Sequence, residues 1–141
     1  MKRQKGQAIV EFAIVFPFLL MLLFGLIFSG LVFSDYMTLS NAARSSAREA
    51  ALAPSKASDI ASDYTNYFQT SSPLVTGIYQ APTFAIDPEN TTPPHSIKVT
   101  ISTTLNGSFP GVGALNYLGI MLPGQESPIQ IQYFMHREDP V

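Results

Sequence analysis

A long apolar run near the N-terminus constrains the fold of this chain more than any other feature of its sequence. No charged side chain occurs between Glu11 and Asp35, so residues 12–34 form an uninterrupted run of 23 uncharged, mostly apolar residues. The hydrocarbon core of a bilayer is about 30 Å thick, and a helix that crosses it needs about 20 such residues. We therefore expect one transmembrane helix over residues 12–34, with the lipid bilayer as a partner.

The charges on the two sides of the run predict its orientation. Lys2, Arg3 and Lys5 precede the run, whereas the first charge after it is Asp35 and the first base after it is Arg44. Short segments rich in lysine and arginine stay in the cytoplasm. We therefore expect a single-pass protein of the bacterial inner membrane, with its N-terminus cytoplasmic and its C-terminal part extracytoplasmic.

Three kinds of N-terminal segment begin in this way. A secretory signal peptide has an apolar region of about 7–15 residues and ends at a cleavage site. The run in this chain is longer, and its helical pattern continues without a break. An uncleaved signal anchor and a prepilin-type leader both fit the length, and the residues around Gly6 favour the leader.

A glycine and an acid flank the start of the run at a characteristic spacing. A short basic leader ends at Gly6, and a lone carboxylate, Glu11, follows five residues later, directly before Phe12. This arrangement resembles the processing site of type IV prepilins, and Gly-x-x-x-x-Glu-Phe is similar to the form found in the Flp/Tad branch. The resemblance implies that a prepilin peptidase cuts between Gly6 and Gln7, which makes residues 1–6 a leader.

Two interpretations of Glu11 remain open. A carboxylate that enters the hydrocarbon region costs on the order of 2.5–3.5 kcal/mol, so intramembrane acids are rare and tend to be functional. In the first interpretation, Glu11 pairs with the new α-amino group of Gln7 or of a neighbouring subunit, and with Phe12 it sets the register of assembly. In the second, Glu11 lies in the headgroup layer and pairs with nothing.

Small residues within the run favour contact with another membrane helix. Gly25 and Ser29 form a small-xxx-small pair, which lets two membrane helices approach closely. This pair is a candidate helix-packing site. Pro17 falls early in the run, where neighbouring groups in a membrane helix can satisfy the backbone around a proline, and the sequence leaves open whether the helix bends there.

The helical pattern continues well beyond the run. Apolar residues recur at three- and four-residue steps, while charged residues occupy other positions. Pro54 predicts the end of the helix, because the residue before a proline disfavours helical geometry. We therefore expect one long helix over residues 7–53, followed by a head over residues 54–141. The stripe consists of Tyr36, Leu39, Ala43, Ala47, Ala50 and Ala51.

The segment from Gly6 to Ala51 resembles the TadE-like family. The shared features are Gly-Gln-Ala-x-x-Glu-Phe at residues 6–12, a proline early in the span, and Asn-Ala-Ala-Arg-x-x-Ala-Arg at residues 41–48. The resemblance implies a pseudopilin or minor pilin that takes part in building Flp/Tad pili for tight adherence to surfaces. It implies other pilin-like subunits and the Tad inner-membrane assembly platform as partners. A pseudopilin that primes assembly and a minor pilin incorporated into the surface pilus both remain open.

The head combines an amphipathic helix with strands. Steps of three and four residues predict the helix over residues 55–68, and a period of two predicts strands over residues 97–105 and 129–136. Weaker strands are expected over residues 74–79 and 83–86, and a partly buried loop over residues 106–128. The expected fold class is α+β and pilin-like: a long N-terminal transmembrane helix extends into a small extracytoplasmic head with an antiparallel sheet. Turns are expected at Pro82, Pro88, Pro93 and Pro94.

Few residues could carry catalysis. The chain has no cysteine, and its two histidines, His95 and His136, lack partners at a spacing that would suit a metal site or a general base. A net charge of −2 gives no electrostatic reason to expect a nucleic-acid partner. We therefore expect no enzyme, metal or cofactor. The alternative to an assembly component is a signal-anchored extracytoplasmic binding module that does not polymerise.

Overall fold

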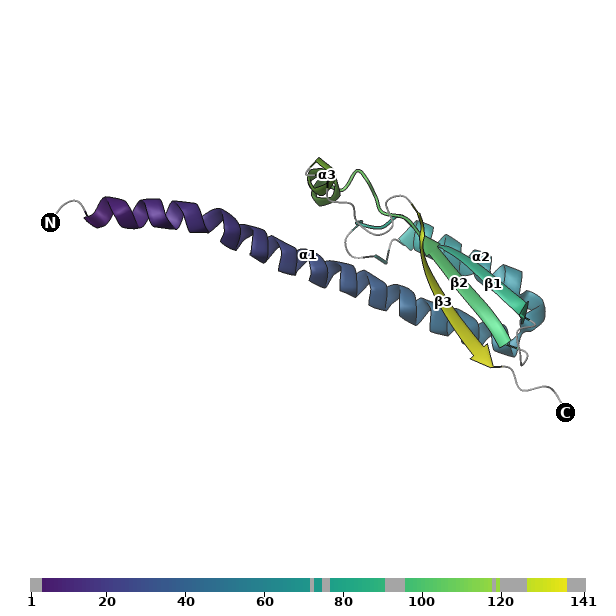
Figure 1. Cartoon of the computed structure of the whole chain (residues 1–141). Coiled ribbons are helices and arrows are strands. Elements are labelled where there is room, and N and C mark those ends of the chain that lie inside the picture. Colours follow the sequence, from purple (N-terminus) through teal and green to yellow (C-terminus); the bar gives the residue numbers. More distant parts are fainter. Residues whose placement is uncertain are drawn as a thin grey trace. The chain divides into compact units, whose positions relative to one another are not determined.

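The computed structural model describes residues 4–71, 73, 74, 77–90, 96–117, 119 and 127–136. The chain divides into two compact units, Met1–Phe33 and Ser34–Val141, and the second is called the head below. The elements, drawn in Figure 1, are α1 (Gln4–Leu52), a 3₁₀ turn (Pro54–Lys56), α2 (Ala57–Ser71), β1 (Thr83–Asn90), β2 (Ser96–Thr103), α3 (Pro110–Tyr117) and β3 (Ile129–His136). The α+β fold class is confirmed.

Helix α1 runs for 49 residues, as the apolar run and the alanine stripe together predict. It continues through Pro17 without ending. It ends at Leu52, and the next residue, Ala53, is no longer helical, with φ of −138° and ψ of 70°. That conformation suits the residue before Pro54, because the proline ring clashes with a helical neighbour.

The first unit, Met1–Phe33, presents apolar side chains on all sides of α1. Phe18 is 71% exposed and Leu22 is 67% exposed. The helix is long and apolar enough to cross a membrane by length and composition, and its most apolar window has no residue buried inside the structure. A helix that is hydrophobic all round is stable only where lipid or protein surrounds it.

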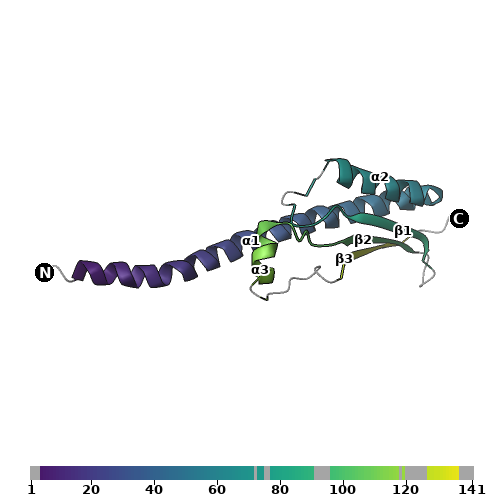
Figure 2. The same ribbon diagram turned by 90° about the horizontal axis from the view of Figure 1, so that it is seen from above.

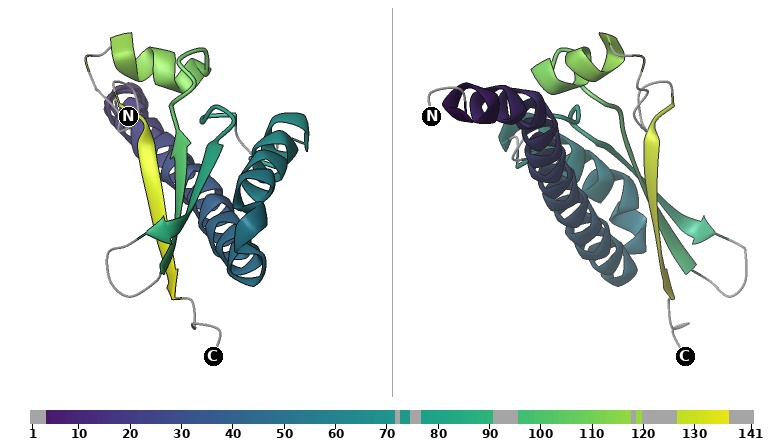
Figure 3. Two further views of the ribbon diagram at one scale, coloured as in Figure 1. Left: turned by 90° about the vertical axis from the view of Figure 1, so that its right-hand side faces the viewer. Right: turned by 60° about the vertical axis from the view of Figure 1, so that its left-hand side comes forward.

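The head contains one three-stranded antiparallel sheet in the order β1-β2-β3. In the central strand, Val99 lies opposite Ile86 of β1 and Tyr133 of β3. The residues of β2 alternate between buried and half-buried along its whole length, so one face of the sheet carries the core. Figures 2 and 3 show α2 and the C-terminal part of α1 on the same face of the sheet. The predicted strands over residues 97–105 and 129–136 are confirmed as β2 and β3.

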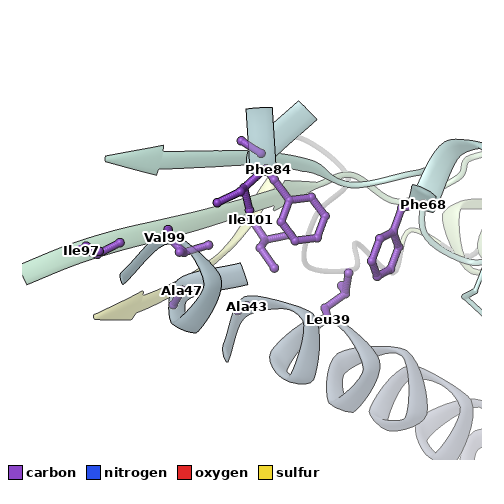
Figure 4. Close-up of a cluster of buried hydrophobic side chains, with 11 residues drawn as sticks. Leu39, Ala43, Ala47, Phe68, Phe84, Ile97, Val99 and Ile101 are labelled. Carbon is purple, nitrogen blue, oxygen red and sulfur yellow. The ribbon is translucent and has the colours of Figure 1, made fainter. Parts of the chain in front are cut away.

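One hydrophobic core joins the C-terminal part of α1, α2 and the sheet (Figure 4). The contribution of α1 comes at steps of four and three residues, as predicted, and consists mostly of alanine, so the helix backbone can approach the sheet closely. The Phe68 ring of α2 lies 5.3 Å from the Phe84 ring of β1, centroid to centroid. The buried members are Leu39, Ala43, Ala47, Ala50, Ile60, Ala61, Phe68, Phe84, Ile97, Val99 and Ile101.

Two hydrogen bonds fix α2 between its neighbours. The Tyr64 hydroxyl donates to Ser45 Oγ of α1 at 2.9 Å. At the start of β1, the backbone N–H of Phe84 donates to Thr65 Oγ1 of α2 at 3.0 Å. The predicted helix over residues 55–68 is therefore present, with a 3₁₀ turn at its start and three further residues at its end.

The close packing of α1 against the sheet predicts that a larger side chain at Ala47 destabilises the head. Ala47 has no exposed surface, so the Ala47→Leu variant must fit a larger side chain into a filled space. We expect it to lower the free energy of unfolding of the head by about 1–3 kcal/mol, measured by chemical denaturation in detergent and followed by near-UV circular dichroism of the tyrosines. Glu49→Leu is the matched control because Glu49 is exposed on the same helix. Equal stability of both variants would contradict the close packing.

Two details of the predicted sheet are wrong. Strand β1 does not end at residue 86 but continues to Asn90 and contains Pro88, which is therefore not a turn residue. The register shifts between Asp87 and Asn90, and an edge strand with such an irregularity tolerates proline because no ladder hydrogen bond is lost. The strand expected over residues 74–79 is replaced, in its described part, by an isolated antiparallel bridge from Tyr79 to Leu105.

The predicted loop over residues 106–128 contains a helix, α3, in its described part. Val112 of this helix is buried, with 1% exposure, whereas Tyr117, one of the residues on which the expected burial rested, is 92% exposed. Pro93, Pro94 and His95 lie outside the described residues.

Candidate functional site

The predicted processing site lies at the beginning of α1. The helix starts at Gln4, so the bond between Gly6 and Gln7 falls in its first turn. Backbone N–H groups in the first turn have no acceptor within the helix, and glycine is a weak helix former. A Cβ atom added at Gly6 would meet no atom within 4 Å. The backbone around this bond can therefore unwind from the helix at a low cost in free energy.

The structure brings Gln7 and Glu11 together. Gln7 Nε2 donates a hydrogen bond to Glu11 Oε1 at 3.3 Å, between two exposed side chains. The two residues are one helical turn apart and share a face, as residues at i and i+4 do. Their spacing in the sequence contains the signal for this contact, which we did not predict. The side chain of the residue that follows Gly6 thus contacts the lone carboxylate.

Phe12 lies on the helix beside this pair and is 61% exposed. Its ring centroid is 5.3 Å from that of Phe16, with the ring planes tilted by 34°. These two rings form an apolar surface directly after Glu11. A carboxylate and an aromatic pair are thus adjacent at the start of the apolar segment, and both face outward.

Gly25 and Ser29 lie farther along α1 within the first unit. A Cβ atom at Gly25 would meet no atom within 4 Å, and the Ser29 hydroxyl donates to the Leu26 carbonyl oxygen at 2.9 Å. Since the hydroxyl bonds to its own helix, the Gly25–Ser29 surface can approach another helix without first finding a partner for the hydroxyl. Packing of a second helix at this surface stays a prediction.

His136 is exposed at the end of β3. In the described part of the chain, no three His, Asp or Glu side chains gather in a way that could hold a metal ion. The N-terminal residues therefore offer an exposed glycine in the first helical turn, a carboxylate and an apolar surface.

One comparison with known proteins covers the residues of this candidate site. The model of the family described as TadE-like protein matches residues 6–48, which include all six predicted site residues. No curated protein and no solved structure matches the chain. The TadE-like family is a structural, non-enzymatic kind of protein that is associated with Tad pilus systems. The resemblance is thus confirmed over residues 6–48, and this segment of the chain is TadE-like.

Proposed function

We propose that this chain is a pseudopilin or minor pilin that takes part in assembling Flp/Tad pili for surface adherence. The observation that carries the proposal is the combination of Gly6, Gln7 and Glu11 at the start of the TadE-like segment. These residues open a helix whose apolar side chains are exposed through residue 33. Such a helix needs lipid before assembly and neighbouring subunits within a fibre.

In this proposal the chain crosses the bacterial inner membrane once, with its N-terminus in the cytoplasm. Lys2, Arg3 and Lys5 hold that end inside. A prepilin peptidase removes residues 1–6 on the cytoplasmic side, and the mature chain starts at Gln7. Other pilin-like subunits and the Tad inner-membrane platform are then the partners of residues 7–33.

The side-chain contact at 3.3 Å supports a role for Glu11 after cleavage. Because Gln7 and Glu11 share a helix face, the α-amino group released at Gln7 forms one turn away from the carboxylate. A pair between this carboxylate and an α-amino group, in the same subunit or in a neighbour, would offset the cost of placing Glu11 at the edge of the hydrocarbon. Such a pair would also fix the axial register of one subunit against the next.

The test of the proposal is the intact mass of the membrane-extracted protein, made with and without a cognate prepilin peptidase. We expect the peptidase to remove residues 1–6 from the parent chain and to leave the Gly6→Val variant whole. Gly30→Val is the matched control and should be processed like the parent. At both glycines an added Cβ would meet no atom within 4 Å, so neither substitution disturbs the packing of the chain.

A parent chain that keeps residues 1–6, under conditions where a known prepilin is cut, would refute the proposal. The signal-anchored binding module would then be the better interpretation, and the head would be the place to look for function. Processing of Gly6→Val at the same rate as the parent would show that the peptidase does not recognise Gly6.

A further inference from the structure

The two edges of the sheet differ in chemistry. Strand β1 forms one edge and β3 the other, because β2 lies between them (Figure 3). The β1 edge is covered at its start, where the Phe84 N–H donates to Thr65 Oγ1 of α2 at 3.0 Å. Farther along, β1 carries the exposed Asp87 and then Pro88, and its register with β2 shifts between Asp87 and Asn90. Coverage, charge, proline and irregular register are the features by which natural edge strands avoid pairing with another chain.

Strand β3 lacks the charge, the proline and the irregularity. It consists of Ile129–His136 and contains no Asp, Glu, Lys, Arg, Pro or Gly. It pairs with β2 residue for residue over its whole length without a register shift, and no second strand among the described residues pairs with it. A regular, uncharged edge strand of this length presents a row of backbone N–H and C=O groups, which is a template for another strand.

The side chains of β3 are also less covered than those of the central strand. On the core face, Ile131, Tyr133 and Met135 are only half-buried, although they pack against the hydrophobic core. The residues opposite them in β2 have no exposed surface. On the other face, Phe134 is 53% exposed. The core face is therefore closed at β2 and still open along the edge that β3 forms.

A second copy of the chain has a strand that matches this edge. Because the β1 edge is covered and charged, β3 is the edge through which two copies can join their sheets. A two-fold axis normal to the sheet places the two β3 strands antiparallel, with the same surface on both sides. In each register that keeps core face beside core face, odd-numbered residues lie opposite odd-numbered ones, and these are all apolar. No Asp, Glu, Lys or Arg of β3 opposes a like charge, so the edge is complementary to itself.

We propose that β3 is a dimerisation edge, where β3 of a second copy adds antiparallel and joins the two three-stranded sheets into one. The added strand covers the exposed parts of Ile131, Tyr133 and Met135, and burial of this apolar surface stabilises the pair. Main-chain hydrogen bonds between the two strands add to the affinity. The pairing involves residues of the head alone and does not depend on cleavage at Gly6, so either proposal can fail while the other stands.

The chain has no cysteine, so a single introduced cysteine reports contact between copies. The full-length variants Gln130→Cys, Gln132→Cys and Phe134→Cys place a thiol on the exposed face of β3, and Thr83→Cys and Ala85→Cys are the matched controls on the exposed face of β1. Each variant is treated in detergent with a short bismaleimide. This reagent joins side chains that lie directly opposite, with Cβ atoms about 4.5–5.5 Å apart, and diagonal ones at about 7–8 Å. The three β3 positions therefore cover neighbouring registers.

We expect the β3 cysteines to give several-fold more covalent dimer than the β1 cysteines. Equal yields from the two edges, or no dimer from β3, would overturn the proposal. A parent chain that is monomeric alone, and whose β3 cysteines crosslink only to a different co-expressed pilin-like subunit, would identify another partner for this edge and would also overturn it.

A charged variant separates contact at β3 from contact between the N-terminal helices. Gln132→Lys brings two like charges directly or diagonally opposite each other across the axis, which disfavours strand pairing. Gln132 is exposed, so the head keeps its fold, and Thr83→Lys is the matched control on β1. We expect sedimentation in detergent to show a Kd of the dimer that rises several-fold with Gln132→Lys and stays unchanged with Thr83→Lys. An unchanged Kd with Gln132→Lys would place the contact elsewhere and overturn the proposal.

Discussion

A Glu11→Gln variant is expected to lose most or all pili while the removal of residues 1–6 continues. Glutamine keeps the size of the side chain and can still accept the hydrogen bond from Gln7 Nε2, but it has no charge to pair with an α-amino group. If that ion pair sets the register between subunits, its loss affects assembly and leaves cleavage and membrane insertion unchanged. The neutral side chain even enters the bilayer more easily, since the charged one costs on the order of 2.5–3.5 kcal/mol.

The measurement is the number of pili per cell by electron microscopy in cells that express only the variant, together with the intact mass of the membrane-bound protein. Glu11→Asp retains the charge on a shorter side chain and should restore part of the piliation. Asp63→Asn is the control for loss of one negative charge elsewhere, because Asp63 is exposed on α2. Normal piliation with Glu11→Gln would favour the interpretation that Glu11 lies unpaired in the headgroup layer.

The long helix could be predicted because two independent patterns in the sequence agree. The uncharged run over residues 12–34 requires a helix in lipid, and the alanine stripe from Ala43 to Ala50 requires a helix on the head. The uncharged run ends at Ser34 and the stripe begins at Tyr36, with no proline or glycine from there to Pro54, so nothing in the sequence interrupts the helix before Pro54. Agreement between local pattern and global fold is what makes a segment predictable.

Helix α3 could not be predicted because its own sequence argues against it. Two of its eight residues are Gly111 and Gly113, and each glycine disfavours a helix by about 1 kcal/mol relative to alanine. The helix forms because contacts from elsewhere in the head hold it. The Asn106 carbonyl oxygen accepts a hydrogen bond from the Phe109 N–H directly before the helix, Pro110 suits the first helical position, and Val112 is buried in the head. Such contacts between distant segments leave no periodic pattern in the sequence.

For the candidate site too, features set by neighbouring residues in the sequence could be predicted, whereas contacts with other chains could not. The spacing of Gly6, Gln7 and Glu11 predicted a processing site, and these residues fall within the TadE-like match. Their side-chain contact follows from helical geometry once the helix is known. A partner of Glu11 on another subunit could not be predicted from this sequence alone, because the register between two chains depends on both of their surfaces.

An Ile101→Ala variant is expected to destabilise the head strongly. Ile101 has no exposed surface and lies in the central strand, opposite Phe84 of β1 and Ile131 of β3. Truncation of such a side chain leaves a cavity and typically costs about 2–5 kcal/mol. A domain of this size is stable by about 5–15 kcal/mol, so this one change removes a large part of the total.

The measurement is the denaturation midpoint of the full chain in detergent, with limited proteolysis as a second readout of opening of the head. Thr100→Ala is the matched control, since Thr100 is the adjacent residue of β2, faces away from the core and pairs with Ala85 and Gln132. Because Thr100 is half-buried in β2, a change there should cost at most about 1 kcal/mol, the range of strand propensities. Ile101→Val should fall between the two, at about 0.5–1.5 kcal/mol.

The order of these three variants tests the orientation of the sheet against α1 and α2. If Thr100→Ala destabilised the head as much as Ile101→Ala, the faces of β2 would be reversed, because a shift of one residue moves every side chain of a strand to the opposite face. The same variants test whether the stability of the head affects processing of the N-terminal segment. The proposed cleavage between Gly6 and Gln7 would depend on residues in the first unit, so we expect Ile101→Ala to be processed like the parent even where proteolysis shows that its head has opened.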